Sequence, residues 1–317
     1  MKCYLSEIIL ITCTNNINIF EQWLFWHKNI IGFEHIIVVD NNSIVDLKTV
    51  CDKYQNVEYV YKPGSISQSD TYNYYVNNSK AYWCLPIDDD EFVYISDKYN
   101  NNINNLIIKM HDEHKEFFKL SFMWAMMFSK DIIQSRNLSD PVFKDFTYMY
   151  TKTEFIEHII NIKTLVNTLV KHYYVKDTDP LIRVKYEDLD LPPEKLIYWK
   201  NAGWNMLIPY DHMGTVHNPI SKLFDTYIHA YNVTNGFTDI GYLGHKNLEI
   251  TDDAYICHYK FRSFDEWKYK IYQRSKYNDL YSDYDAHYME ETFYKAYSYK
   301  DKFIENLNPL KLWEKYH

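Results

Sequence analysis

Apolar runs of strand length alternate with helix-like segments over the first ninety residues, and this alternation strongly constrains the fold. Strands that are apolar throughout are typical of parallel sheets covered on both faces. The sequence therefore predicts an α/β fold with a mostly parallel sheet and helices on both faces. The predicted strands are EIILITCT (7–14), HIIVVD (35–40), NVEYVY (56–61) and AYWCLPID (81–88), and the predicted helices are 16–33, 45–54 and 67–80.

Local signals set the ends of two predicted helices. Asn18 and Glu21 have capping-box spacing at the start of the first helix, and Gly32 is a stop signal at its end. Ser263 and Glu266 have the same spacing before a helix over 263–275. The other segments are a long strand at 117–128, mixed structure at 151–175, a loop-like excursion at 176–212 and helical packing at 277–299.

Charge and cysteine usage limit the classes of function. The net charge is −9 and no basic stripe is present, which argues against a nucleic-acid partner. Five scattered cysteines without a CxxC pair are typical of a reducing compartment. The first apolar run is interrupted by Ser6 and Glu7, and no apolar stretch approaches eighteen residues. We therefore expect no signal peptide, no membrane span and a cytoplasmic location.

The aromatic share of 18% is high, with 32 tyrosines. It fits either an AT-rich genome or aromatic lining of a sugar-binding cleft.

Polar clusters follow the predicted strands where a parallel sheet places its ligands. They are CTNN after the first strand, DNNS after the second and the acids Asp88, Asp89, Asp90 and Glu91 after the fourth. The acidic run could be a solvated turn, a helix N-cap cluster or a structural calcium loop. Adjacent carboxylates at the mouth of a buried strand repel one another, however, and a cation relieves that repulsion. Oxygen ligands at this spacing suit Mg²⁺ or Mn²⁺.

Glycine-based phosphate cradles are missing from the sequence. No GxGxxG follows the first strand, and no GxxxxGK[ST] occurs. A divalent ion held by an Asp-x-Asp pair can neutralise a diphosphate instead, and it stabilises charge on a leaving nucleoside diphosphate.

Several motifs in order resemble GT-A-type glycosyltransferases of the family-2-like and family-92-like group, whose fold is Rossmann-like. EQWLFWHKNIIGFEHIIVVDNNSIVD resembles the group's E-W-x-x-x-H-x-x-x-G helix and D-N-x-S-x-D strand end, and WCLPIDDDEF resembles its D-x-D-E-F. Glu21 lies two residues before Trp23, one more than in the family. The positions on the pattern are His27, Gly32, Asp40, Asn41, Ser43, Asp46, Asp88, Asp90, Glu91 and Phe92.

Further segments extend the resemblance. Gln68 resembles the family's Gln before the helix that leads to the metal strand. MWAMMF (123–128) resembles its W-x-x-F segment without the following Gly, and VHNP (216–219) and CHYKFRSFDEWKYK (257–270) resemble its later His motifs. The resemblance covers 5–130 well and 213–275 loosely, and leaves 170–212 without a counterpart.

The resemblance implies a nucleotide-sugar donor and a divalent metal, with roles for the aspartates. Asp40 should contact the base or ribose, or else it caps the turn that follows. Asp88 and Asp90 should face the metal and the ribose-diphosphate. Thr12 and Asn15 are candidates for the base edge.

Two histidines and two basic residues are further candidates near the phosphates. His258 or His217 could complete the metal shell or bind diphosphate. Arg262 and Lys268 could neutralise the diphosphate, or they form a solvated helix face. We expect Asn41, Ser43 and Asp46 to form turns and His27 to be a core histidine.

An inverting transfer needs a carboxylate that deprotonates the acceptor hydroxyl. The sequence offers Glu91, Asp188 and Asp211, with Asp140, Asp145, Glu154 and Glu187 as alternatives. A retaining mechanism without such a base stays open.

The sequence thus predicts one GT-A-like domain over 1–317 with a helical C-terminal elaboration. Residues 1–130 would form the nucleotide-sugar and metal half, 131–275 the acceptor half and 276–317 the extension. The predicted activity is transfer of a sugar from a UDP- or GDP-sugar to an acceptor hydroxyl, of hexosyltransferase type, with Mn²⁺ or Mg²⁺, in glycan synthesis. Alternatives are a sugar-nucleotide pyrophosphorylase and a non-catalytic carbohydrate-binding protein. A pyrophosphorylase would carry a basic, Gly-rich loop after the first strand, and CTNNIN is neither.

Overall fold

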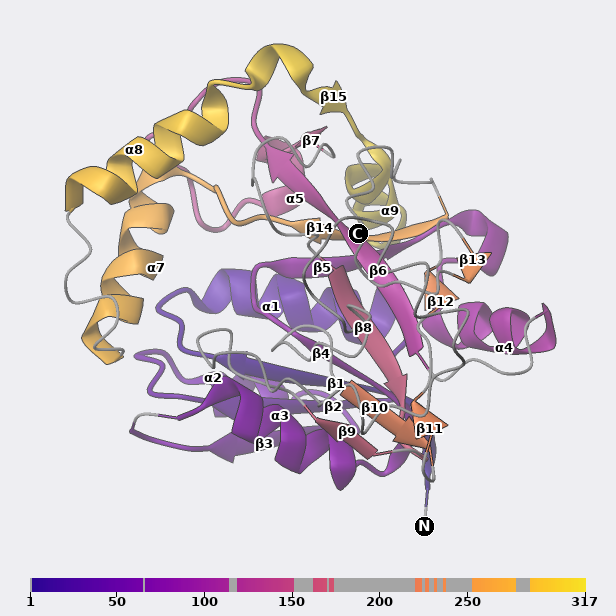
Figure 1. Ribbon diagram of the computed structural model, residues 1–317. Helices are drawn as coiled ribbons and strands as arrows, with labels where there is room; N and C mark the ends of the chain where they lie inside the picture. The colour runs from indigo at the N-terminus through magenta and orange to yellow at the C-terminus, as the bar shows by residue number, and fades with distance from the viewer. Residues whose placement is uncertain are drawn as a thin grey trace, which may run out of the picture.

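The structure is a computed structural model that describes residues 2–64, 66–113, 119–150, 162–169, 171–173, 220–223, 226–227, 231–232, 236–237, 253–277 and 286–317. Figure 1 shows a large sheet with helices packed on it and a second group of elements above one end. The first half of the chain consists of β1 (Tyr4–Thr12), α1 (Ile17–Phe25), a π-helical turn (Trp26–Ile30), β2 (His35–Asp40), α2 (Leu47–Cys51), β3 (Val57–Tyr61), α3 (Gln68–Asn77), β4 (Ala81–Ile87), β5 (Glu91–Ile95), a 3₁₀ turn (Asp97–Tyr99), α4 (Ile103–Glu113) and β6 (Lys119–Phe128).

The second half supplies shorter strands and the C-terminal helices. The described elements are α5 (Val142–Asp145), β7 (Tyr148–Tyr150), β8 (Ile162–Asn167), β9 (Lys171–Tyr173), β10 (Ile220–Leu223), β11 (Thr226–Tyr227), β12 (Tyr231–Asn232), β13 (Gly236–Phe237), β14 (Ala254–His258), α7 (Phe264–Tyr277), α8 (Ala286–Tyr297), a 3₁₀ turn (Lys300–Lys302), β15 (Ile304–Glu305) and α9 (Asn308–Tyr316).

The first four strands form a parallel sheet. β1 pairs in parallel with β2 and with β4, and β2 pairs in parallel with β3, so the strand order is β4-β1-β2-β3. Beyond β4, the antiparallel β8 connects the sheet to β6. β14 then lies between β5 and β6, antiparallel to the former and parallel to the latter.

Alternating side chains of the central strands enter two different cores. Ile8 and Leu10 pack in a cluster that includes residues of α1, α2 and α4, whereas Ile9 packs with Tyr72 and Val76 of α3. Successive residues of a strand point to opposite faces, so a strand covered on both sides must be apolar at every position. The predicted α/β fold with helices on both faces is confirmed (Figure 1).

A third cluster supports the C-terminal helices. Met126 and Phe128, at the end of β6, pack against Phe264 and Trp267 of α7 and Phe293 of α8. The predicted helical C-terminal elaboration is confirmed by α8 and α9. Among the described residues, no helix is both long and apolar enough to cross a bilayer. All five cysteines are described, and none of them forms a disulfide.

One predicted helix cap is wrong, and one predicted helix start is confirmed. α1 is capped by Asn16, whose Oδ1 accepts the Ile19 N–H at 3.2 Å, and not by Asn18, which lies inside the helix. Asn16 has the extended backbone of a cap residue. α7 begins at Phe264, directly after the predicted cap Ser263.

Gly32 ends the first helical segment as predicted. Its φ is +80°, and an added Cβ would lie 2.3 Å from Nδ2 of Asn102. Asn102 cannot easily move aside, because its Oδ1 accepts the backbone N–H groups of Asn104 and Asn105 at the start of α4.

We expect Gly32→Ala to destabilise the protein by about 2–4 kcal/mol, from positive-φ strain and the clash with Asn102. Gly64→Ala is the matched control, since Gly64 has φ +90° with open space around its Cβ position, and it should cost about 1 kcal/mol. Urea unfolding measures both. Equal losses would show that the contact with Asn102 has no energetic weight.

Candidate functional site

The acid turn, defined here as Asp88–Glu91, joins the carboxyl end of β4 to the start of β5. The Glu91 side chain closes it, because Glu91 Oε2 accepts the Asp88 N–H at 2.9 Å. The Glu91 N–H donates to the Asp88 carbonyl at 3.2 Å. The turn therefore has a defined shape, with its carboxylates held at the edge of the sheet where parallel folds place ligands.

Three aromatic rings of the first helical segment hold the strand that follows the acid turn. Trp23 Nε1 donates to the Glu91 carbonyl at 2.9 Å, and Trp26 Nε1 donates to the Val93 carbonyl at 2.6 Å. The Val93 N–H donates to His27 Nε2, so His27 must carry its proton on Nδ1, which donates to the Trp23 carbonyl. His27 is thus a fully bonded core histidine, which places it away from the site chemistry.

Lys163 of β8 contacts two acids of the turn from inside the sheet. Its Nζ lies 3.1 Å from Asp88 Oδ2 and 3.2 Å from Glu91 Oε2, and its side chain is 1% exposed. Burial opposes the charged ammonium, but Asp88 and Glu91 outweigh that effect and raise the pKa of Lys163. This internal ion pair holds the acid turn against the sheet.

Glu91 is enclosed rather than presented to solvent. Its side chain is fully buried, and burial together with the charges of Asp88 and Asp90 raises its pKa, with Lys163 opposing. A carboxylate in this position cannot reach an acceptor hydroxyl that arrives from solvent. The structure thus gives Glu91 the task of closing the turn and argues against the predicted role of proton acceptor.

Asp88 has a full set of protein partners. Gln68 Nε2 donates to its Oδ1 at 2.9 Å, Tyr72 Oη approaches the same oxygen, and Lys163 pairs with Oδ2. The structure therefore brings Gln68 into the site, as a partner of Asp88. Asp88 itself has no uncommitted oxygen for a metal ion.

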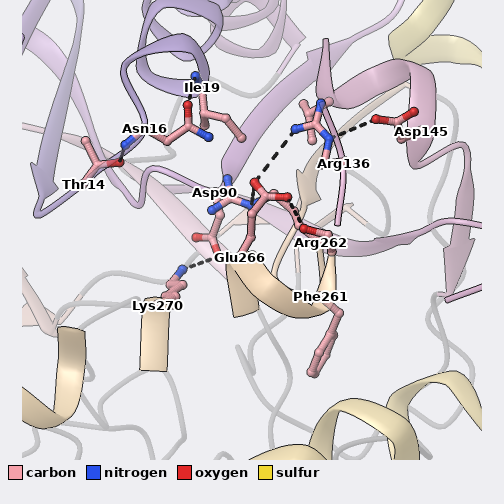
Figure 2. Close-up of polar contacts among 12 residues, drawn as sticks. Thr14, Asn16, Ile19, Asp90, Arg136, Asp145, Phe261, Arg262, Glu266 and Lys270 are labelled. Atoms are coloured by element: carbon pink, nitrogen blue, oxygen red, sulfur yellow. Dashed lines mark hydrogen bonds and ion pairs between the residues drawn. The ribbon is translucent and has the colours of Figure 1, made fainter. Parts of the chain in front are cut away.

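Asp90, like Glu91, has one carboxylate oxygen to which no described residue bonds. Its Oδ2 pairs with Lys270 of α7 and lies 3.4 Å from His258 Nε2, as Figure 2 shows for the lysine. Its Oδ1 is buried, and no described residue bonds to it. Burial alone would raise the pKa of Asp90, but Lys270, His258 and Arg262 hold that pKa well below its ordinary value. Asp90 is therefore a carboxylate at neutral pH.

His258 reaches the acid turn through strand register. β14 pairs with β5 so that His258 lies opposite Glu91, and the next residue, Tyr259, donates its N–H to the Asp90 carbonyl at 2.8 Å. Burial lowers the pKa of His258 to about 4, so the ring is neutral at pH 7. Its Nδ1 is also buried with no bonding partner among the described residues.

The donor-side candidates lie at the ends of β1 and β2. Thr12 Oγ1 donates to Asp89 Oδ2 at 2.7 Å, which brings Thr12 to the acid turn, whereas Asn15 is exposed in the loop after β1. Asp40 accepts the Ser43 N–H at 2.8 Å and the Tyr59 hydroxyl at 2.7 Å. These bonds favour the alternative in which Asp40 caps its own turn.

The turn-forming residues behave as the sequence predicts. Ser43 Oγ accepts the Thr14 N–H, Asn41 Nδ2 donates to the carbonyls of Lys62 and Gly64, and Asp46 caps α2 by accepting the Thr49 N–H.

A basic cluster adjoins Asp90 at the start of α7. Arg262 Nε lies 3.3 Å from Glu266 Oε1, and Arg136 pairs with Asp145 and approaches the same glutamate at 3.9 Å (Figure 2). Arg262 Nη1 is buried, and none of the described residues accepts from it. Arg262 therefore retains a donor beside Asp90, while Lys268, on the same helix, is exposed.

The remaining carboxylate candidates divide into two groups. Asp145 is engaged by Arg136, and Asp140 Oδ1 lies 3.8 Å from Lys144 Nζ at the surface. The others, together with His217, lie outside the described residues: Glu154, Glu187, Asp188 and Asp211.

Two lysines of the site were missed in the sequence. Lys163 stands within the apolar segment IKTLV of β8, and a lysine in a buried strand indicates a buried acidic partner. Lys270 lies one helical turn after Glu266. The face of α7 that carries it could be assigned only once the start of α7 was known.

The donor atoms at Asp90 and His258 fit a divalent cation in part. The described residues contain no group of three or more Asp, Glu, His and Cys side chains that is close enough to hold a metal. Two ligands at about 2.1 Å from one octahedral ion lie roughly 3 Å apart, and the distance from Asp90 Oδ2 to His258 Nε2 is 3.4 Å. These two residues would hold the ion, and a nitrogen ligand favours Mn²⁺ over Mg²⁺. Asp88, predicted as the second acidic ligand, does not fit.

Comparisons with known proteins returned structural matches only. No family model and no curated protein matches the chain. Similar solved structures include S. aureus TarS residues 1–349 in complex with UDP, with 17% identity over 74% of this chain and 61% of that one and a TM-score of 0.29. Another is glucosyl-3-phosphoglycerate synthase from Mycobacterium tuberculosis in complex with Mn²⁺, UDP and phosphoglyceric acid, with 10% identity over 38% of this chain and 43% of that one and a TM-score of 0.27.

A third match is 4-diphosphocytidyl-2C-methyl-D-erythritol synthase from Anaerococcus prevotii DSM 20548. It shares 15% identity over 52% of this chain and 71% of that one, with a TM-score of 0.30. The chain spans less than two thirds of the S. aureus and M. tuberculosis proteins. At these TM-scores the likenesses carry no conclusion about function.

We expect His27 to make the protein sensitive to acid. Its pKa is lowered by burial to about 3, against 6.5 when unfolded, so the unfolded state binds the extra proton between these values. The contribution to stability is complete above pH 6.5 and is lost as the pH falls to 3, by about 4–5 kcal/mol. His27→Gln should show a shallower loss of unfolding free energy from pH 6.5 to 4 than wild type. His111→Gln, at an exposed position of α4, is the control, and parallel curves for wild type and His27→Gln would contradict the assignment.

Lys163→Met should destabilise the protein by about 3–5 kcal/mol, because it leaves the carboxylates of Asp88 and Glu91 without their buried partner. Lys48→Met removes a lysine from an exposed ion pair with Asp52 and should change the unfolding free energy little. Chemical denaturation of both variants provides the measurement. A Lys163→Met protein as stable as the Lys48→Met protein would show that Lys163 does not hold the acid turn.

Proposed function

We propose that this protein is a GT-A-type glycosyltransferase that uses a nucleotide-sugar donor and a divalent cation. The observation that carries the proposal is the proximity of His258 Nε2 to Asp90 Oδ2, 3.4 Å apart, at the carboxyl end of the parallel sheet. Each residue keeps a buried polar atom to which no described residue bonds. The ordered motifs of the sequence, from the α1 helix to DDDEF, support the same function.

The proposed donor site lies along the carboxyl ends of β1, β2 and β4. Thr12 and Asp89 fix the loop on the β1 side, and Asp40 shapes the turn after β2. The base and ribose would lie against these two turns, with the diphosphate directed to Asp90. The CTNN loop after β1 contains no lysine or arginine, which disfavours the pyrophosphorylase alternative.

Asp90 and His258 would hold the cation, and Arg262 would donate from its free Nη1 to a phosphate oxygen. When bound, the cation would neutralise the diphosphate of the donor and the charge that develops on the leaving nucleoside diphosphate. Lys163 keeps the neighbouring acids in a fixed geometry, so that Asp90 needs no rearrangement of the turn to bind. The acceptor would bind to the 131–275 half. The base that deprotonates its hydroxyl would be a carboxylate of that half, and Asp188 and Asp211 are the candidates.

We expect UDP-sugars or GDP-sugars to raise the melting temperature only when Mn²⁺ or Mg²⁺ is present. A ligand at 100 times its Kd stabilises the folded state by about 2.7 kcal/mol, which corresponds to a shift of several degrees. Asp90→Asn should abolish the shift while retaining the fold, as judged by circular dichroism. Asp52→Asn, at an exposed ion pair, should retain it.

An undiminished shift in Asp90→Asn, or an equal shift without metal, would contradict the proposed role of Asp90. In the wild-type protein, slow hydrolysis of one member of a panel of nucleotide-sugars would identify the base and the sugar of the donor together. A wild-type protein that neither binds nor hydrolyses any of them would instead favour the non-catalytic alternative.

A further inference from the structure

Lys270 and His258 contact the same oxygen of the same carboxylate. Lys270 Nζ forms an ion pair with Asp90 Oδ2, and His258 Nε2 lies 3.4 Å from that atom. Oδ2 is also the oxygen that lies at a suitable distance from His258 for both to bind one ion. A cation shared by Asp90 Oδ2 and His258 Nε2 would therefore bind the same oxygen as the Lys270 ammonium. Figure 2 shows the contact of Lys270 with Asp90.

An ammonium group and a divalent ion compete for this oxygen. Two like charges separated by the width of one ligand atom repel strongly, and the repulsion is largest where water is excluded, as it is around the buried Asp90. Lys270 in its present position therefore opposes binding of a cation between Asp90 Oδ2 and His258 Nε2. No described residue bonds to Asp90 Oδ1, so the competition arises at Oδ2.

The two lysines of the site differ in their freedom to leave. Lys163 is 1% exposed and is shared by two acids, whereas the side chain of Lys270 is 17% exposed and pairs with Asp90 alone among the described acids. Lys270 can therefore rotate into solvent, and Lys163 cannot without breaking the turn. Lys270 is therefore exchangeable, and Lys163 is fixed.

Helix α7 keeps Lys270 close to the acid turn after such an exchange. Phe264, Trp267 and Ile271 are buried in the cluster shared with α8, so the backbone of α7 stays anchored while the lysine side chain moves. A lysine released from Asp90 would remain within reach of any anion bound to the cation. Lys268, two residues earlier and exposed, lies on a different face of the helix.

We infer that Lys270 is an exchangeable counter-ion of Asp90, displaced by the divalent cation and then available to the donor's diphosphate. The inference rests on the proposed function for the identity of the anion. Without metal, Lys270 keeps the buried Asp90 neutralised and the turn intact. With metal, the same ammonium adds a positive charge beside the phosphates, so one residue serves both states.

The test measures Mn²⁺ and UDP binding separately in Lys270→Met, by calorimetry and by electron paramagnetic resonance of free Mn²⁺. We expect the Kd for Mn²⁺ to fall at least tenfold, because the competing ammonium is gone. The Kd for UDP in saturating Mn²⁺ should rise about tenfold, because a phosphate contact is lost. A purely structural role for Lys270 would weaken both ligands together.

Three further variants separate the effect of charge from the effect of position. Lys270→Arg keeps a positive charge and should leave the Mn²⁺ affinity near that of wild type. Lys268→Met removes an exposed lysine from the same helix and should change neither Kd. Asp90→Asn in combination with Lys270→Met should lose the gain in Mn²⁺ affinity, and circular dichroism verifies that each variant is folded.

An unchanged or weaker Mn²⁺ affinity in folded Lys270→Met overturns the exchange. A tighter Mn²⁺ affinity with unchanged UDP binding overturns the contact with diphosphate. If wild type binds Mn²⁺ but neither UDP nor GDP, the proposed function fails, while the Mn²⁺ titrations alone still decide whether Lys270 competes at Asp90.

Discussion

The ion pairs of Lys163 with Asp88 and Glu91 are the interaction on which the site depends. Adjacent carboxylates at a buried strand end would repel one another and draw the turn into solvent. A single ammonium inside the sheet reverses that balance, because it lies within 3.2 Å of both acids. The acid turn is thereby folded before any ligand arrives, and the charge of Asp90 is balanced separately, by Lys270.

The position of Lys163 follows from the way the sheet changes direction. β8 runs antiparallel between β4 and β6, so Lys163, near the start of β8, lies beside the end of β4. β14 enters between β5 and β6 and brings His258 to the start of β5. The first four parallel strands supply the acids, and the strands that interrupt the parallel pattern supply the cation and the imidazole. The site is thus assembled where the two parts of the sheet meet.

Much of the fold could be predicted from the sequence, because the determining signals are local. Continuous apolar strands, a glycine at the left-handed helix end and Ser263 before α7 each act within a few residues. The cap of α1 shows the limit: Asn16 and Asn18 are the same residue type, and backbone conformation, not identity, decides which one caps. The sequence therefore located the helix and misplaced its cap by two residues.

The acid turn shows the same limit for function. The motif DDDEF specifies which residue types stand at the strand end, but their roles depend on partners from β8, β14 and α7. Asp88 and Asp90 look equivalent in the sequence, yet Gln68, Tyr72 and Lys163 occupy the first, while the second shares one oxygen between Lys270 and His258. The difference arises from long-range pairing that residue spacing does not encode. An Asp-x-Asp motif therefore marks a candidate metal site, and the charges packed around each carboxylate decide which aspartate can accept the ion.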